Sequence, residues 1–273
     1  MTAQLPQLLA DLFALNAHTA IVTGATGGLG LTMTLALAEA GANVISIEMP
    51  DDPASPNLQE QVDESGRYFE RHECDVKDST QLRSVFASIW KQADELKDSR
   101  PLPNILISCA GINRRGPAEQ LTDEEIDETF AVNQKATFVC GQELAAGLLQ
   151  RQLPGKIISV ASVTGFISAT TISAYAATKG AVLQTTRAFS SEWASKGIQV
   201  NALCPGYFWT EMTRQYQEEP QYKGFNEYVL SRCPTGRWGV PDDLRGAVIF
   251  LASRASDYMT GQSLVVDGGL LGQ

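Results

Sequence analysis

HTAIVTGATGGLGLTMTLALAEA, residues 18–40, joins three patterns within one short stretch. The apolar run over 18–22 predicts a buried strand, and the apolar residues after position 30 recur with the period of a helix. Between them, Gly24, Gly28 and Gly30 predict a tight turn. Such a turn lets the backbone approach a diphosphate closely, and the free N–H groups that begin the next helix favour an anion there. A glycine-rich turn can also be only a tight connection, so the other motifs must decide.

The end of the next expected strand bears on which dinucleotide would bind. The strand over 43–47 is followed by Glu48, twenty residues past Gly28. A carboxylate there can accept hydrogen bonds from both hydroxyls of an adenine ribose, although a solvated carboxylate after a strand is the simpler interpretation. The 2′-phosphate of NADP would meet a like charge, and no nearby cation offsets it at Ala25, Thr26, Met49 or Pro50. The pattern predicts NAD and disfavours NADP.

Strand and helix patterns alternate along the rest of the chain. Further strands are expected over 68–73, 104–107, 156–160, 198–203 and 263–266, and helices over 79–96, 123–150, 175–195 and 242–252. Residues 1–18 predict a flanking turn or helix, and 50–66 a surface loop with at most one short helix. The alternation predicts an α/β fold, a Rossmann-like doubly wound parallel sheet of about seven strands with helices on both faces.

Composition excludes several classes of protein. The formal net charge of −10 over 273 residues argues against nucleic-acid binding, and no apolar run is long enough for a membrane span or a signal peptide. Five scattered cysteines without a CxxC motif predict buried free thiols in the cytoplasm. With two histidines in the chain, we expect no metal site. No repeat or break in composition separates the chain, so we expect one domain over 1–273, with an aromatic-rich insertion over about 206–233 where a substrate lid would sit.

A second motif lies in KIISVASVTGFISATTISAYAATKGA, residues 156–181. Ser162 follows a strand pattern, and Tyr175 and Lys179 are four residues apart, which places them on one face of a helix. Any amphipathic helix can contain such a pair by chance. A phenol with a pKa near about 10 becomes useful for proton transfer at neutral pH when a cation such as Lys179 favours the phenolate.

Taken in order, these motifs resemble the short-chain dehydrogenase/reductase family over almost the whole chain, from about residue 13 to 270. The matching positions are Thr23, Gly24, Gly28, Gly30, Asp75, Ala110, Gly111, Asn133, Ser162, Tyr175, Lys179, Pro205, Gly206, Thr210 and Val266-Asp267-Gly268-Gly269. The resemblance implies a homotetramer and a catalytic tetrad. Tyr175 would exchange a proton with the alcohol or ketone oxygen, Ser162 would hold that oxygen, Lys179 would bind the nicotinamide ribose and lower the tyrosine pKa, and Asn133 would hold a water in a proton relay.

The resemblance also implies which residues surround the cofactor. They are Gly24, Thr26, Gly27, Gly28, Leu29, Gly30, Glu48, Asp75, Val76, Ala110, Gly111, Tyr175, Lys179, Pro205, Gly206 and Thr210. One departure is clear, because Ser108-Cys109 stands where the family usually has two asparagines. We expect this change to alter local stability or cofactor affinity and to leave the chemistry intact.

Within the family the chain resembles 2-deoxy-D-gluconate 3-dehydrogenases and gluconate 5-dehydrogenases, through AGINRR at 110–115, ALCPGY at 202–207 and RCPTGRWGVPDDL at 232–244. We therefore expect an oxidoreductase that transfers a hydride between NAD(H) and the secondary alcohol or ketone of a sugar acid. Arg114 or Arg115 would pair with the carboxylate, beside Ser162, Tyr207 and Trp209. One alternative is a ketoreductase for a secondary metabolite or small apolar ketone, which the aromatic lid residues Tyr207, Phe208, Trp209 and Tyr216 would hold. The other is a nonenzymatic dinucleotide-binding scaffold.

Overall fold

A parallel sheet runs through the middle of the computed structural model, which describes residues 7–273. Its seven strands lie in the order β3-β2-β1-β4-β5-β6-β7, and every neighbouring pair is parallel. Their bounds are β1 (Thr19–Thr23), β2 (Asn43–Glu48), β3 (Phe69–Glu73), β4 (Pro103–Ser108), β5 (Gly155–Val160), β6 (Ile198–Pro205) and β7 (Ser263–Val266). The doubly wound sheet expected from strand–helix alternation is confirmed.

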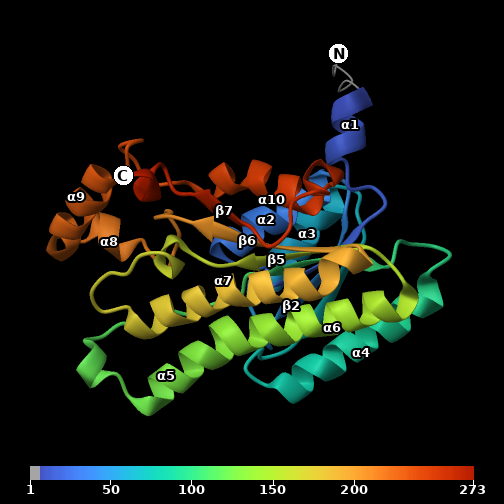
Figure 1. The fold of residues 1–273 in the computed structure, drawn as a ribbon, viewed down its shortest axis with the longest axis horizontal. Coiled ribbons are helices and arrows are strands. Elements are labelled where there is room, and N and C mark those ends of the chain that lie inside the picture. Colours follow the sequence, from blue (N-terminus) through green and yellow to red (C-terminus); the bar gives the residue numbers. More distant parts are fainter. Residues whose placement is uncertain (1–6) are drawn as a thin grey trace.

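Helices cover both faces of this sheet (Figure 1). One face carries α4 (Ser79–Leu96), α6 (Ala136–Arg151) and α7 (Ser173–Trp193), and the other carries α2 (Gly28–Glu39), α3 (Ser55–Glu64) and α10 (Arg245–Ala252). Strand β1 is buried along its whole length: Ile21 points into the core under α4 and α6, and Ala20 and Val22 point into the core under α2 and α10. A strand buried on both sides must be apolar throughout, which explains its continuous apolar run.

The order in which the strands are added to the sheet reverses at β1. From β1 it winds outward through α2 to β2 and β3, and it then crosses to β4 on the other side of β1. The connections therefore diverge at the carboxyl ends of β1 and β4, which opens a crevice there. Open α/β sheets bind ligands at such a switch point.

The helix expected over 123–150 is interrupted. The structure has α5 (Asp123–Phe130), then a π-helical turn (Ala131–Lys135), then α6. Its start is as expected, since Thr122 caps the helix and Glu125 completes the capping box. A π-helical turn inserts an extra residue into the helix and is common at functional sites. Here the turn contains Asn133.

Other elements refine the expectations. Residues 50–66 hold a ten-residue helix, α3, and 206–233 hold α8 (Gln215–Glu218) and α9 (Lys223–Arg232). Near the N-terminus, α1 (Gln7–Phe13) projects from the body, and the part of that expectation that covers residues 1–6 lies outside the described residues (Figure 1). The cysteines are free thiols. None of the helices within 7–273 has the length and apolar character that crossing a membrane requires.

Candidate active site

The glycine turn between β1 and α2 is shaped by contacts that exclude side chains. Gly24 has a φ of +67°, and a Cβ added to Gly30 would lie 1.9 Å from the Gly24 carbonyl oxygen. Gly27 precedes α2 without a side-chain cap, so the first N–H groups of that helix stay available to a ligand. The turn is therefore a compact cradle whose exposed backbone donors suit a diphosphate.

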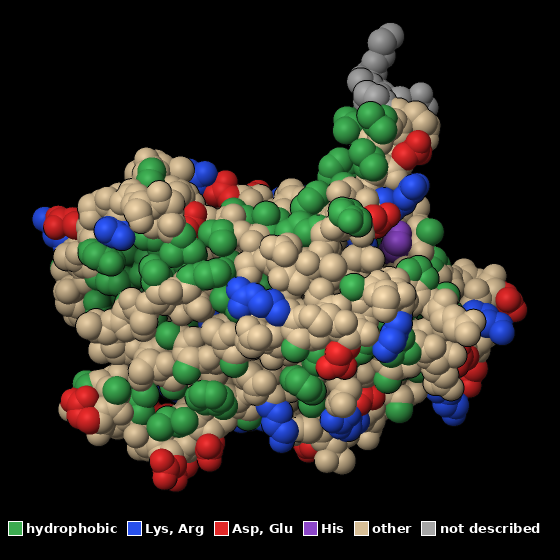
Figure 2. Space-filling view, viewed as in Figure 1, with side chains coloured by type: hydrophobic (Ala, Val, Ile, Leu, Met, Phe, Trp, Pro, Cys, Tyr) green, Lys and Arg blue, Asp and Glu red, His purple; other side chains and the backbone are tan. Residues whose placement is uncertain are grey.

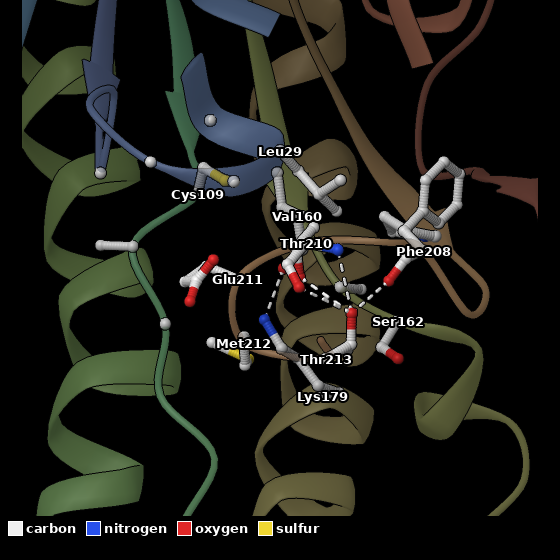
Figure 3. A pocket seen from close by; sticks show the side chains of 18 of the residues that line it. Leu29, Cys109, Val160, Ser162, Lys179, Phe208, Thr210, Glu211, Met212 and Thr213 are labelled. Atoms are coloured by element: carbon white, nitrogen blue, oxygen red, sulfur yellow. Dashed lines mark hydrogen bonds between the residues drawn. The ribbon is translucent and has the colours of Figure 1, made fainter. Parts of the chain in front are cut away.

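A cavity of about 400 Å³ opens in front of this turn. Thirteen of the residues expected around the cofactor line it: Gly24, Thr26, Gly27, Gly28, Leu29, Gly30, Ala110, Gly111, Tyr175, Lys179, Pro205, Gly206 and Thr210. The segment 208–213 is held across the cavity by Thr213, whose hydroxyl donates to the Phe208 carbonyl at 2.6 Å and accepts from the Thr210 N–H at 2.9 Å (Figure 3).

A second cavity, of about 410 Å³, lies beside the first. The residues that the two cavities share are Ser162, Tyr175, Gly206, Phe208, Met212 and Thr213. The second cavity is otherwise walled by the loop after β4, by the turn after β5, and by aromatic rings of 206–238. Ser162 and Tyr175 thus lie where the first cavity, which borders the glycine turn, meets the second cavity, which has room for a second molecule.

Ser162, Tyr175 and Lys179 lie together in the structure. Ser162 accepts the Thr164 N–H at 3.1 Å and begins a 3₁₀ turn after β5, and α7 brings Tyr175 and Lys179 onto one face. Lys179 is buried, and its Nζ donates to the Val160 carbonyl at 2.7 Å (Figure 3).

The pKa values of Tyr175 and Lys179 differ from the expectation. Burial raises the pKa of Tyr175 to about 12, and the Ser162 hydrogen bond opposes that rise. Burial also lowers the pKa of Lys179 to about 8. Desolvation of each group outweighs their mutual influence, because Nζ is directed at Val160 and lies 5.5 Å from the centroid of the Tyr175 ring.

Asn133 is buried beneath this group, on the π-helical turn. Its Oδ1 accepts the Ile112 N–H at 2.8 Å, and its Nδ2 donates to the Ile112 carbonyl at 2.9 Å and to Thr178 Oγ1 at 3.2 Å. An asparagine within a helix is often only exposed, whereas this one clamps the loop after β4 to α7. The extra residue of the π-helical turn changes which side chains face inward, which the sequence pattern did not reveal.

Three residues expected around the cofactor lie outside the described lining of the first cavity: Glu48, Asp75 and Val76. The side chain of Glu48 is 0% exposed, and its Oε2 lies 3.0 Å from Arg71 Nε. Arg71 also pairs with Glu73 at 3.0 Å. The positions considered from the sequence, 25, 26, 49 and 50, supply no cation, but β3 places Arg71 beside Glu48. Asp75 pairs with Lys77 at 3.4 Å, and Val76 is buried.

The two arginines after β4 separate. Arg115 lines the second cavity, with its guanidinium carbon 4.7 Å from the centroid of the Tyr216 ring. Arg114 instead pairs with Glu128 at 2.6 Å, outside both cavities. Tyr207 lines the second cavity as expected, whereas the half-exposed Trp209 faces an outer groove. Consecutive residues in an extended loop point in different directions, so adjacent arginines need not share a site.

Several lining residues were not expected from the sequence: Asn113, Thr164, Thr213, Phe225 and Trp238. The density of aromatic residues in 206–238 was the available signal for the last two. Cys109, expected to affect cofactor affinity, lines the first cavity. Tyr216, expected as an aromatic lid residue, lines the second cavity with Phe225 and Trp238. Their rings pack edge-to-face with one another and with Tyr207, and Figure 2 shows hydrophobic side chains gathered around α8 and α9.

Ser108-Cys109 replaces the two asparagines that are usual in the family. At this point Thr23 Oγ1 accepts hydrogen bonds from the backbone N–H groups of Cys109 and Ala110, both at 3.2 Å.

Known proteins resemble the chain over nearly its whole length. A family model described as enoyl-(acyl carrier protein) reductase matches residues 24–271. The 2-dehydro-3-deoxy-D-gluconate 5-dehydrogenase of Pseudoalteromonas atlantica is 37% identical over 96% of this chain and 99% of its own. The gluconate 5-dehydrogenase of Gluconobacter oxydans is 38% identical over 95% and 97%. Among solved structures, a gluconate 5-dehydrogenase from Burkholderia cenocepacia in complex with NADP and tartrate is 37% identical, with a TM-score of 0.86 over 97% and 99%.

Proposed function

The chain belongs to the short-chain dehydrogenase/reductase family, and on that premise we propose that it oxidises or reduces a sugar acid with NAD(H). A hydride would pass between the nicotinamide and a secondary alcohol or ketone carbon of a substrate such as gluconate or 2-deoxy-D-gluconate. One observation carries the proposal: the cavity at the glycine turn and the second cavity meet at Ser162 and Tyr175. A cofactor in the first and a substrate in the second would come into contact beside a hydroxyl and a phenol.

The proton-handling roles follow from what each side chain can donate. With its raised pKa, Tyr175 is a protonated phenol at neutral pH and can give its proton to a ketone oxygen during reduction. The Ser162 hydroxyl can donate to the same oxygen as negative charge develops there. Lys179, whose ammonium is directed inward from α7, would hold the cofactor ribose. The nicotinamide itself would supply or accept the hydride.

Asn133 has a positioning role in this proposal. Its side-chain amide engages both backbone groups of Ile112, which fixes the loop that runs from Gly111 to Arg115. That loop borders both cavities. Asn133 would therefore set the distance between the nicotinamide and the substrate pocket, and it could also hold a water in a proton relay.

Arg115 supports an acidic substrate. It is the cation on the described wall of the second cavity, and a guanidinium binds a carboxylate through paired, charge-assisted hydrogen bonds. The relatives named above are sugar-acid dehydrogenases, and the related structure from Burkholderia cenocepacia contains tartrate, a dicarboxylate. Arg115 also stacks on Tyr216, so a bound carboxylate would meet the segment 206–233, which we propose acts as a lid.

The preference for NAD rests on the charge near the end of β2. Arg71 is shared by two carboxylates, Glu48 and Glu73, and a third, Asp52, accepts a hydrogen bond from the Thr26 hydroxyl at 2.6 Å. A 2′-phosphate would have to displace carboxylates from Arg71 and would add negative charge to a corner that already carries an excess of it. NAD brings no such charge. Asp75 and Val76 would lie near the adenine.

By resemblance to the family, we also propose a single-domain chain that assembles into a homotetramer. Both cavities are built on one sheet, which supports a single dinucleotide-binding and catalytic domain. Phe130 and Phe138 are partly exposed on α5 and α6, which supports association with further copies into a homotetramer. By resemblance to the family, we place the enzyme in the cytoplasm.

A second candidate function is reduction of an apolar ketone. The aromatic walls of the second cavity, formed by Tyr207, Phe225 and Trp238, favour it. A substrate screen separates the two candidates: sugar acids and hydrophobic ketones are each offered with NAD(H) and with NADP(H), and cofactor absorbance is followed. We expect the highest kcat/KM with a sugar acid and NAD(H). Faster turnover of uncharged ketones would favour the second candidate.

A further inference from the structure

We propose that Asn113 and Thr164 form a hydroxyl-recognition site in the second cavity, one that selects a substrate chain with hydroxyls next to the reacting carbon over a chain that lacks them there. The inference rests on the proposed function for the identity of the substrate, and it adds the residues that would recognise the sugar hydroxyls. Arg115 would bind any carboxylate, so it does not by itself distinguish a sugar acid from a simpler acid. Recognition of a polyol needs additional polar groups at the wall.

Two such groups are present and unused within the described structure. Asn113 Oδ1 and Thr164 Oγ1 are both buried atoms without a hydrogen-bond partner, and both residues line the second cavity. Buried polar atoms are normally paired, because an unpaired one loses its hydrogen bond to water without replacement. Both oxygens belong to residues that line one cavity, so rotation of either side chain would turn its unpaired oxygen toward a ligand that supplies the missing partner.

Both side chains are carried by backbone that is tied to the catalytic group. Asn113 follows Ile112, whose N–H and carbonyl are both held by the Asn133 amide. Thr164 follows Ser162 by two residues, and its N–H donates to the Ser162 hydroxyl at 3.1 Å. The two oxygens are thus positioned by contacts that also position the reacting centre, which suits recognition of hydroxyls close to the carbon that is oxidised.

The chemistry of the two groups fits a sugar hydroxyl. An amide oxygen accepts a hydrogen bond, and the threonine hydroxyl can donate or accept, so a hydroxyl that does both can pair with either side chain. Rotation of the Asn113 amide would offer a donor instead, which a hydroxyl also accommodates. An apolar ketone satisfies neither oxygen. A site that hydrogen-bonds a substrate hydroxyl discriminates strongly against the analogue that lacks it.

The test compares D-gluconate with its monodeoxy congeners, using wild-type enzyme, Asn113→Ala and the nearly isosteric Thr164→Val. The expected result is that each variant loses about tenfold in kcat/KM for D-gluconate, while kcat/KM for at least one deoxy congener changes less than about twofold. Thr80→Val is the matched control, since Thr80 is exposed in the first turn of α4, outside both cavities, and the change should leave every rate unaltered. If both variants keep the wild-type ratio between gluconate and every deoxy congener, the inference is wrong.

A second arm separates this inference from the proposed function. The same variants are assayed with the uncharged alditol and its deoxy congeners, which carry hydroxyls but no carboxylate. Suppose that the wild type turns over the alditol as well as D-gluconate, and that the variants lose the preference for the alditol over its deoxy congeners. Hydroxyl recognition then stands, and the assignment of a sugar acid as the substrate fails. Where turnover is too slow to measure, substrate affinity is measured by calorimetry instead of kcat/KM. If neither Thr164→Val nor Asn113→Ala changes that affinity, the inference is wrong.

Discussion

Lys179 Nζ lies 5.5 Å from the centroid of the Tyr175 ring and donates to the Val160 carbonyl at 2.7 Å. The ammonium is therefore anchored to the end of β5, and its own burial dominates its proton affinity. The pair consists of a phenol that resists losing its proton and an amine that gives up its proton more readily than an exposed lysine. This arrangement predicts a specific dependence of stability on pH.

Lys179 should make the free energy of unfolding rise with pH above about pH 8. Its pKa is about 8 in the folded chain against 10.5 for an exposed lysine, so between these values the unfolded state binds more protons than the folded state. Urea denaturation of wild type and Lys179→Met should show the wild type gaining stability relative to the variant from about pH 8 to pH 10, on the order of 2 kcal/mol. Tyr175 acts with the opposite sign, and only above about pH 10. Parallel curves for the two proteins would contradict this assignment.

Arg115 and Arg114 should respond differently to truncation. Arg115→Ala is expected to raise KM for a sugar acid about tenfold or more, because a charge-assisted hydrogen bond to the carboxylate is lost. Arg114→Ala is the matched control and should change KM less than about twofold, since Arg114 pairs with Glu128 away from the cavity. Steady-state kinetics on both variants measures the difference. Equal effects at the two positions would mean that the carboxylate lies elsewhere.

Gly30→Ala should be more destabilising than Gly27→Ala, because only Gly30 is in close contact with the backbone across the turn. A Cβ at Gly30 would lie 1.9 Å from the Gly24 carbonyl oxygen, whereas a Cβ at Gly27 would meet no atom of the described residues within 4 Å. Gly30→Ala should lower the free energy of unfolding by about 1–3 kcal/mol and weaken dinucleotide binding, because the turn must shift. Gly27→Ala should retain wild-type stability. Chemical denaturation and cofactor titration of the two proteins test this, and a destabilised Gly27→Ala variant would be inconsistent with the turn geometry.

Glu48 and Arg71 should control cofactor choice together. Glu48→Ala frees the Arg71 guanidinium from one carboxylate, so the ratio of kcat/KM for NAD to that for NADP should fall about tenfold. Adding Arg71→Ala to that variant should reverse part of the gain with NADP, because the cation is removed. The assay is steady-state turnover with each cofactor. A wild-type enzyme that already prefers NADP would refute the charge argument.

The parts of the site that could be predicted from sequence depend on local geometry. The glycines from 24 to 30 shape a single turn, and Tyr175 and Lys179 share one helix face by spacing alone. Topology then brings Ser162 to them, because the carboxyl ends of parallel strands meet at one edge. The parts that could not be predicted depend on contacts between distant elements or on single torsions. Arg71 reaches Glu48 only through the pairing of β3 with β2, and the choice of Arg115 over Arg114 follows from the course of one loop.

The chemistry at the meeting point of the two cavities is the central claim, and Tyr175→Phe tests it most directly. Removal of the phenolic hydroxyl deletes the proposed proton donor and keeps the ring that lines both cavities. On the substrate that the wild type turns over fastest, kcat should fall about 10²–10⁴-fold, while cofactor affinity measured by titration stays within about threefold. A Tyr175→Phe enzyme that keeps most of its wild-type rate would contradict the account.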